Sequence, residues 1–291
     1  MRYTHLSFDL DGVCTCIPDG GPDTCKPNGA PPQRCDNGNG GEDNSGQALL
    51  KQARDLGKLD FQQAANDSFG SGGRSILITV ASYNGLADDP NVLVGVLISP
   101  GLVDVDGNRI PPKHDKRDQW SVDDSTAVAG NQGVILPLVS KQAYVVNHTL
   151  VVDNIDIALP IAQVGNVTLR SAVFVAKLGD DPAGGYTLTE VSFAGRWSIA
   201  EATRVAGSFE ATVDGGPICD KSPATFGLLK QVICSAADLR ADSKNDPMLP
   251  CNAISIAVRA TLVPASLGKL ITVPVTRNCE NAVNDCAGDG G

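Results

Sequence analysis

Two copies of the pattern Asp-x-Asp-Gly, at positions 9–12 and 104–107, are the clearest candidates for chemistry in this sequence. Calcium takes about six to eight oxygen ligands, which alternate carboxylates and backbone carbonyls can supply. The stretch 36–43, rich in Asp, Asn and Gly, adds a dense group of oxygen atoms. We therefore expect a Ca²⁺ site. Its candidate ligands are Asp9, Asp11, Asp104 and Asp106.

The same pattern has a second interpretation that involves no metal. Neither copy completes an EF-hand, because no Glu stands at the required position of the loop. Asp and Asn beside Gly also form plain turns, since their side chains accept hydrogen bonds from their own backbone. Both interpretations stay open at the level of the sequence.

Carboxylates are also the groups that a polymer hydrolase needs. Adjacent pairs occur at 88–89, 123–124 and 180–181, and Glu190 is the single glutamate between positions 143 and 197. A glycosidase holds two carboxyls about 5 to 9 Å apart across a cleft. Neighbouring residues of a strand point to opposite faces, and in turns both carboxylates are usually solvated. The pairs therefore give weak support to a hydrolase.

Histidines are scarce, and they limit the catalytic options further. The chain has His5, His114 and His148, and a Ser or Cys triad would need one of them. His148 lies within a strand-like run and His114 in a charged loop. The nucleophile elbow and the zinc-protease, Walker and dinucleotide motifs are missing from the sequence. We expect a non-catalytic protein, with an extracellular polymer hydrolase that uses paired carboxylates as the alternative.

Phe8–Val13 resembles the first motif of haloacid-dehalogenase-type phosphatases. In that family the first Asp is the nucleophile, the second is the acid–base and magnesium assists, and the fold is a parallel sheet with alternating helices. The resemblance covers these six residues alone. A loop rich in Cys, Pro and Gly follows them, and the later chain is rich in β-strand patterns.

The elements that must position these residues are mainly strands. Four β-branched, apolar runs are separated by Gly, Pro, Asn and Asp, as is typical of consecutive strands. They are Ala143–Val152, Ile155–Ile161, Val167–Leu178 and Thr187–Trp197. Ser75–Tyr83 and Val92–Ser99 predict a hairpin. Ile254–Val263 alternates apolar and polar residues, which indicates a sheet with one buried face.

These patterns predict a mainly β protein. The expected fold is an antiparallel β-sandwich, of which a lectin-like jelly roll is one form, with two or three peripheral helices. Helical spacing and a capping box predict helices near 47–57, 198–206 and 224–242. We expect three parts: a cysteine-rich loop segment over 1–46, the β-sandwich domain over 47–275, and a flexible cysteine-containing tail over 276–291.

Nine cysteines lie towards the two ends of the chain, with none between positions 36 and 218. Disulfides persist in oxidising compartments, so we expect the protein outside the cell or in the cell envelope. The first 46 residues have too little apolar surface to order by burial. We therefore expect local disulfides among Cys14, Cys16, Cys25 and Cys35. Nine is odd, so at least one cysteine is left over, and the pairing stays open.

Charge and hydropathy limit the classes of partner that we expect for this protein. The net charge of −10 and the pI near 4.7 argue against nucleic acid, because an acidic chain repels phosphates. No apolar run is long enough for a transmembrane segment. The N-terminal residues do not form a signal peptide, so export implies that the given chain has lost its signal.

Cysteines with their flanking residues carry a second resemblance. Phe8–Cys16, Gly29–Pro32 and Cys35–Asn37 are similar to the start of a set of exported, lipoprotein-like proteins of unknown function from myxobacteria. Segments around Cys219, Cys234 and Cys251 are similar as well. The resemblance implies export and no particular activity, and no lipobox cysteine is visible.

Together, these observations predict a secreted or cell-surface module that binds a glycan or a protein and is supported by Ca²⁺. A self-assembling surface or matrix subunit is a further alternative. Aromatic residues make up 4% of the chain, which leaves Trp120 and Trp197 as candidates for a glycan platform. Trp197 ends a strand-like run and therefore suits the core better.

Overall fold

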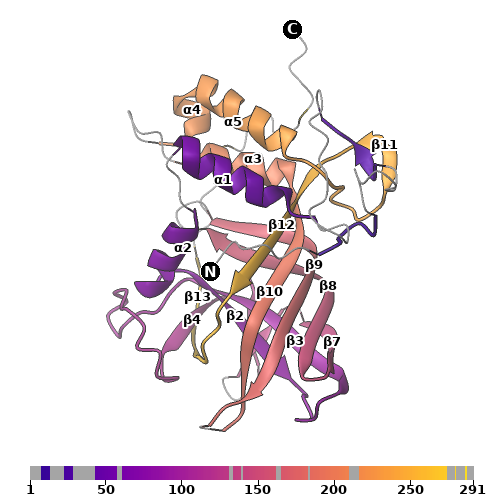
Figure 1. Cartoon of the computed structure of the whole chain (residues 1–291). Coiled ribbons are helices and arrows are strands. Elements are labelled where there is room, and N and C mark those ends of the chain that lie inside the picture. The colour runs from indigo at the N-terminus through magenta and orange to yellow at the C-terminus, as the bar shows by residue number, and fades with distance from the viewer. Residues whose placement is uncertain are drawn as a thin grey trace.

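A curled antiparallel sheet of seven strands, in the order β12-β10-β9-β8-β7-β3-β2, is the centre of the molecule (Figure 1). The structure is a computed structural model. It describes residues 8–13, 23–28, 43–57, 61–130, 134–138, 140–161, 165–182, 184–209, 216–273, 279 and 286. The prediction of a mainly β, antiparallel fold is confirmed. A sandwich or jelly roll is not confirmed.

The strands of the large sheet are β2 (Ser75–Ala81), β3 (Asp89–Ser99), β7 (Ser140–Val146), β8 (Thr149–Ile161), β9 (Gly165–Asp180), β10 (Tyr186–Ser198) and β12 (Ala253–Ala260). Three two-stranded sheets are formed by β1 (Cys25–Lys26) with β11 (Asp246–Pro250), β4 (Gln119–Asp123) with β13 (Ser266–Ile271), and β5 (Ala127–Ala129) with β6 (Ile135–Pro137). The helices are α1 (Ser45–Gly57), α2 (Phe61–Gly70), α3 (Ile199–Ser208), α4 (Ile218–Lys221) and α5 (Pro223–Ser235). Apart from α2, these helices lie together at one end of the sheet (Figure 1).

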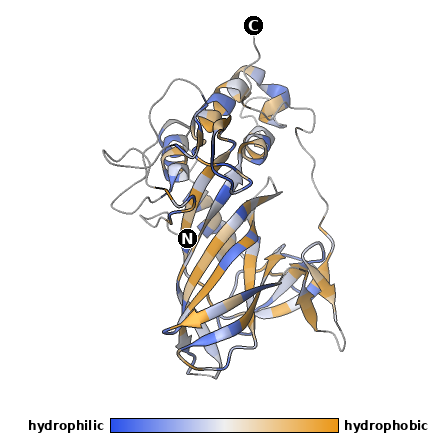
Figure 2. Ribbon diagram, turned by 90° about the vertical axis from the view of Figure 1, so that its right-hand side faces the viewer, coloured by the Kyte–Doolittle hydropathy of each residue, from blue (hydrophilic) through white to orange (hydrophobic). Residues whose placement is uncertain are grey.

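The sheet has an inner face, on which the main core packs, and an outer face. Figure 2 shows hydrophobic residues along the strands of the sheet. Buried side chains of the inner face include Val92, Val94, Val145, Leu150, Phe193 and Ile254. A second, smaller cluster around Leu97, Val122 and Ala127 packs β4 and β5 against β3. Those short strands cover one part of the outer face as members of separate two-stranded sheets, and they do not make a second large sheet.

The predicted run Ala143–Val152 is divided by a turn. Asn147 and His148 have φ angles of 48° and 56°, as a two-residue type I′ hairpin requires at both central positions. The hairpin joins β7 to β8, and β8 continues through the next predicted run. The prediction of a strand position for His148 is therefore wrong.

Two predicted helices differ in their ends or caps. The helix predicted for 224–242 ends at Ser235, because Leu239 then pairs with Ala253 of β12. Ser198 caps α3 by accepting a hydrogen bond from Glu201 N at 3.3 Å. The Glu201 carboxylate binds Thr168 N of β9 at 3.1 Å, a tertiary contact that a capping box does not include. The helix predicted near 47–57 is confirmed as α1.

Strand β12 is buried on both faces, whereas its alternating sequence predicted one buried face. Ile254 and Ile256 pack into the inner core. Ser255 on the outer face is fully buried, and its hydrogen bonds with Asp238 and Ser45 compensate the burial of its hydroxyl. A polar residue of an alternating strand therefore indicates polar partners here rather than solvent.

Three disulfides lie within the part of the chain that the structure describes: Cys25–Cys251, Cys219–Cys279 and Cys234–Cys286. The expectation of a local disulfide is wrong for Cys25, whose partner is 226 residues away. Cys14, Cys16 and Cys35 lie outside the described residues. The disulfides indicate an oxidising, extracellular setting. None of the helices in the described ranges is long and apolar enough to cross a membrane.

Candidate functional site

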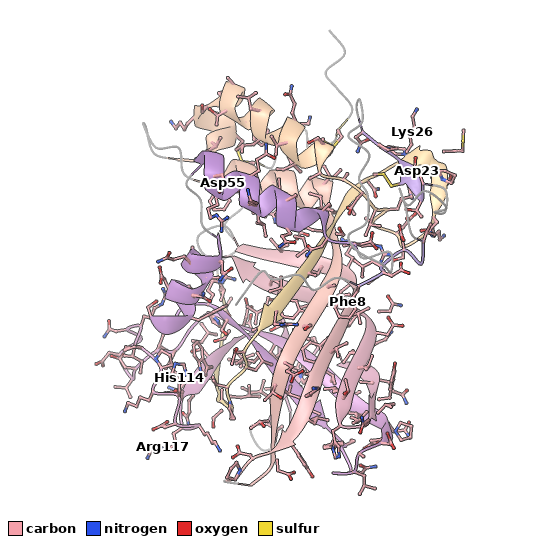
Figure 3. The ribbon with its side chains drawn as sticks, viewed as in Figure 1. Phe8, Asp23, Lys26, Asp55, His114 and Arg117 are labelled. Carbon is pink, nitrogen blue, oxygen red and sulfur yellow. A yellow bond between two sulfur atoms is a disulfide. The ribbon has the colours of Figure 1, made fainter. Side chains whose placement is uncertain are left out.

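Three carboxylates converge where the N-terminal segment meets the sheet. Ligand atoms of Asp9, Asp11 and Asp43 all lie within 4.8 Å of one another. A backbone pairing brings them together, since Asp43 N donates to Phe8 O at 3.0 Å and Leu10 N donates to Asp43 Oδ2 at 2.7 Å. Figure 3 shows Phe8 near the end of the sheet that carries most of the helices. We call the segments Phe8–Val13 and Asp43–Ser45 the N-terminal clasp.

The first Asp-x-Asp-Gly pattern forms a turn that its own carboxylates stabilise. Asp9 Oδ1 accepts from Gly12 N at 2.6 Å, and Asp11 Oδ1 accepts from Val13 N at 2.9 Å. Gly12 has a φ of 77°, which glycine adopts without strain. Thr24 Oγ1 donates to the second oxygen of Asp11 at 2.7 Å. The turn interpretation and the metal interpretation thus apply to the same residues.

Arg196 of β10 lies beneath the clasp with only 5% of its surface exposed. Its Nη2 donates to Leu10 O. Burial lowers the pKa of the Arg196 guanidinium from its usual value, and the carboxylates of Asp43 and Asp11 act in the opposite direction. The acidic group therefore already has one fixed cation beside it, and any metal would share this environment with Arg196.

Asn44 of the clasp and the segment 238–239 together bind outward amides on the free edge of β12. Ala257 N donates to Asn44 Oδ1 at 3.3 Å, and Ser255 N donates to Asp238 Oδ1 at 2.8 Å. Ala253 N donates to Leu239 O at 2.9 Å. The backbone N–H groups of these three alternate residues point away from β10. Each of the three donates a hydrogen bond to a residue outside the strands of the sheet.

The second Asp-x-Asp-Gly pattern is an exposed turn. Asp104 Oδ1 accepts from Asp106 N at 3.0 Å and from Asn108 N at 2.8 Å. Hydrogen bonds from Asn108 lower the pKa of Asp104. Within the part of the chain that the structure describes, these two residues are not part of a group of three converging acids, and Asp9 and Asp11 are. Sequence reasoning did not assign Asp43 as a ligand, although it ends the oxygen-rich stretch 36–43.

The aspartates of the adjacent pairs bind residues both near to them and far from them in the chain. Asp88 accepts from Asn147 N at 2.9 Å, and Asp89 accepts from Asn84 N at 2.7 Å. Glu190 forms an exposed ion pair with Lys177 at 2.9 Å. In the other pairs, Asp123 accepts from Ser125 N within its own turn, Asp124 accepts from Thr272 Oγ1, and buried Asp181 binds Lys116.

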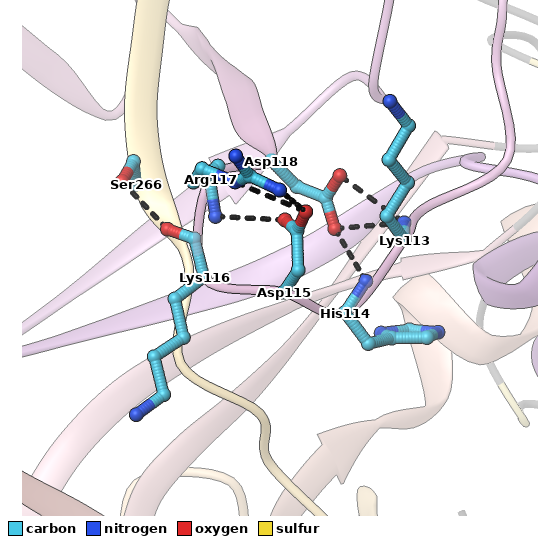
Figure 4. Close-up of polar contacts among 7 residues, drawn as sticks. All are labelled: Lys113, His114, Asp115, Lys116, Arg117, Asp118 and Ser266. Carbon is cyan, nitrogen blue, oxygen red and sulfur yellow. Dashed lines mark hydrogen bonds and ion pairs between the residues drawn. The ribbon is translucent and has the colours of Figure 1, made fainter. Parts of the chain in front are cut away.

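His114 belongs to a polar loop that is held by two aspartates (Figure 4). Asp118 accepts from His114 N at 2.7 Å and from Lys113 N at 2.9 Å. Asp115 binds the Arg117 guanidinium at 2.7 Å. The backbone of His114 thus has a structural role in this loop.

Comparison of the chain with protein-family models, with curated proteins and with solved structures finds no match.

Proposed function

We propose that this protein is an exported, non-catalytic binding module whose N-terminal clasp is stabilised by Ca²⁺. The convergence of the Asp9, Asp11 and Asp43 carboxylates within 4.8 Å carries the proposal. Their position on the clasp makes the ion a structural element, because it would tie two segments of the chain over β12.

The charge and the donor atoms suit a hard divalent cation. Three carboxylates beside the guanidinium of Arg196 leave two negative charges, which one Ca²⁺ balances. Carboxylate oxygens are preferred calcium ligands, and each oxygen that accepts one hydrogen bond retains a second lone pair. Asp9 is exposed, so water can complete the ligand shell. Extracellular modules bind calcium with dissociation constants of about 10⁻⁴ to 10⁻³ M.

For the ligand of the module, the side chains favour a protein over a glycan. Trp120 and Trp197 are 6% and 8% exposed, so neither offers a platform for a sugar ring. Leu93, Tyr144 and Val146 are 43%, 44% and 54% exposed on the outer face, on neighbouring strands. Grouped exposed apolar side chains are typical of protein-binding surfaces. We propose that the partner is a protein that presents apolar side chains.

Thermal unfolding in calcium and in chelator tests the metal proposal. Ca²⁺ at about 10 to 100 times its dissociation constant should add about 1.4 to 2.7 kcal/mol to the free energy of unfolding. That corresponds to a rise of several degrees in Tm for a chain of this size. Asp9→Asn and Asp11→Asn should abolish the rise.

Asp104→Asn is the matched control, since it changes an Asp of the same sequence pattern in the other turn. It should keep the full response to Ca²⁺. Equal Tm values in calcium and chelator for the unaltered protein would overturn the proposal. Loss of the response in Asp104→Asn, with its retention in Asp9→Asn, would move the ion to the other pattern.

A further inference from the structure

We propose that the open edge of β2 pairs antiparallel with β2 of a second copy of this chain. Strand β2 is the last strand of the seven-stranded sheet, and its one ladder partner is β3. Among the described residues, the backbone of Ser75–Ala81 makes no backbone–backbone hydrogen bond outside its ladder with β3, and Ile76 O accepts one side-chain hydrogen bond, from Ser75 Oγ at 3.3 Å. A strand in this position presents a row of donors and acceptors to solvent.

The direction of the open groups follows from the neighbouring strand. Ile98 of β3 donates its N–H to Thr126 Oγ1 at 3.1 Å, and so away from β2. Because Ile98 faces Ile76 in the register, alternation in an antiparallel ladder turns Ile76 away from β3 as well. The N–H and C=O groups of Ile76, Ile78 and Val80 therefore point to the open side.

The residue types of β2 leave this edge unprotected. Its sequence is Ser-Ile-Leu-Ile-Thr-Val-Ala, without charge or proline, and its register with β3 is continuous over all seven residues. Natural sheets usually guard an edge with lysine, proline, a bulge or a very short strand. The absence of all four over a strand of seven residues indicates an edge that is used.

A second copy fits this edge because the strand is complementary to itself. Pairing about a two-fold axis at Ile78 sets Ile78 against its counterpart and Ile76 against Val80 of the other copy. All three pairs are of the hydrogen-bonded type, which gives about six inter-chain hydrogen bonds. The three side chains are partly exposed and pack on the inner core, so pairing would complete their burial.

The distribution of charge also favours a second copy of the chain at the edge of β2. Each copy carries a net charge of −10, so most of its surfaces repel a second copy. The residues of β2 are uncharged, and pairing here brings no side-chain carboxylate of one strand against the other. A sheet of fourteen strands, seven from each copy, would run across the dimer.

Sedimentation velocity and amide hydrogen exchange on the full chain, over a range of concentrations, test the proposal. We expect a dimer whose Ile76, Ile78 and Val80 amides exchange at least about tenfold more slowly as concentration rises. Thr79→Lys places a charge on the outer face of β2, opposite Leu77 of the other copy. It should give a monomer with fast exchange at those three amides.

Leu93→Lys is the matched control, because Leu93 is an exposed outer-face residue of the neighbouring strand β3. It should leave the dimer intact. Loss of the dimer in Leu93→Lys but not in Thr79→Lys would overturn the proposal and assign the interface to the outer face. A monomer at all concentrations, or protection that does not depend on concentration, would also overturn it.

Ile78→Cys provides a test that does not depend on a disruptive charge. Residues of a hydrogen-bonded antiparallel pair have Cα atoms about 5.5 Å apart, within the range of a disulfide. Mild oxidation should therefore link position 78 of one copy to position 78 of the other, as peptide mapping would show. A dimer without this link would contradict the proposed register.

Discussion

The two edges of the seven-stranded sheet are finished in opposite ways. On β12 the outward amides of Ala253, Ser255 and Ala257 are bound by Leu239, Asp238 and Asn44. On β2 the corresponding amides of Ile76, Ile78 and Val80 have no such partners among the described residues. The edge of β12 is covered by other residues of the same chain, whereas the edge of β2 presents uncharged residues with open amides, as a strand-pairing interface would.

The difference shows how much of the chain is needed to close an edge. The residues that cover β12 come from positions 44 and 238–239, about 200 residues apart. Two devices hold them in place, namely the Cys25–Cys251 disulfide and the pairing of Phe8 with Asp43. The acidic group and Arg196 lie at the same place, so the candidate metal site is part of this cover.

The largest expected effect comes from removing the disulfide beside the covered edge. Cys25→Ser with Cys251→Ser should lower the free energy of unfolding by about 2 to 5 kcal/mol, because the bond closes a very long loop. The amides of Ser255 and Ala257 should exchange faster, and those of β2 should not change. Urea unfolding and hydrogen exchange measure the two effects.

Cys219→Ser with Cys279→Ser is the control pair, since that disulfide ties α4 to position 279. It should destabilise the protein without changing exchange at Ser255 and Ala257. Equal changes in β12 exchange for both pairs would show that the covered edge does not depend on the Cys25–Cys251 bond.

A smaller effect is expected from the polar contacts of the cover. Ser255 Oγ accepts from Ser45 N at 2.7 Å and donates to Asp238. Ser255→Ala removes this hydroxyl and leaves Ser45 N and the Asp238 carboxylate short of a buried hydrogen-bond partner. The free energy of unfolding should fall by about 1 to 3 kcal/mol. Urea unfolding checks it. Ser192→Ala, a buried serine on the same face of β10, is the control and should cost less.

The sequence predicted the strands better than it predicted their edges. β-branched runs located the strands of the sheet, and three-four spacing located α1. The cover of β12 depends on contacts between residues far apart in the chain, such as Asn44 with Ala257. Local patterns contain no information about such pairs, so this strand was expected to have one buried face and Cys25 was expected in a local disulfide.

The candidate site was also predictable only in part, because one of its three carboxylates comes from a distant segment of the chain. Asp9 and Asp11 are alternate residues of one turn, and the spacing of the pattern itself identifies them. Asp43 joins them only because its backbone pairs with Phe8. The identical pattern at Asp104 forms a turn of its own, so a short motif could not distinguish the two places.

The smallest expected effect concerns Glu201 of α3. Its charged carboxylate accepts a hydrogen bond from a strand amide, as the neutral side chain of Asn44 does on β12. Burial raises the pKa of Glu201 above its usual value of 4.5, and the hydrogen bond from Thr168 N opposes this in part. The folded state therefore holds the proton more tightly than the unfolded state. Stability from this group is complete below pH 4.5 and is lost as pH rises through the folded pKa.

Glu201→Gln removes that titration and keeps an oxygen that can accept from Thr168 N. The free energy of unfolding of the variant, relative to the unaltered protein, should rise between about pH 4.5 and neutral pH. Urea unfolding at a series of pH values measures the difference, with Glu190→Gln as a control for removing an exposed negative charge. Parallel pH profiles would mean that the half-buried Glu201 carboxylate has no net cost. In that case a charged carboxylate could bind a strand amide at no greater cost in stability than the neutral side chain of Asn44.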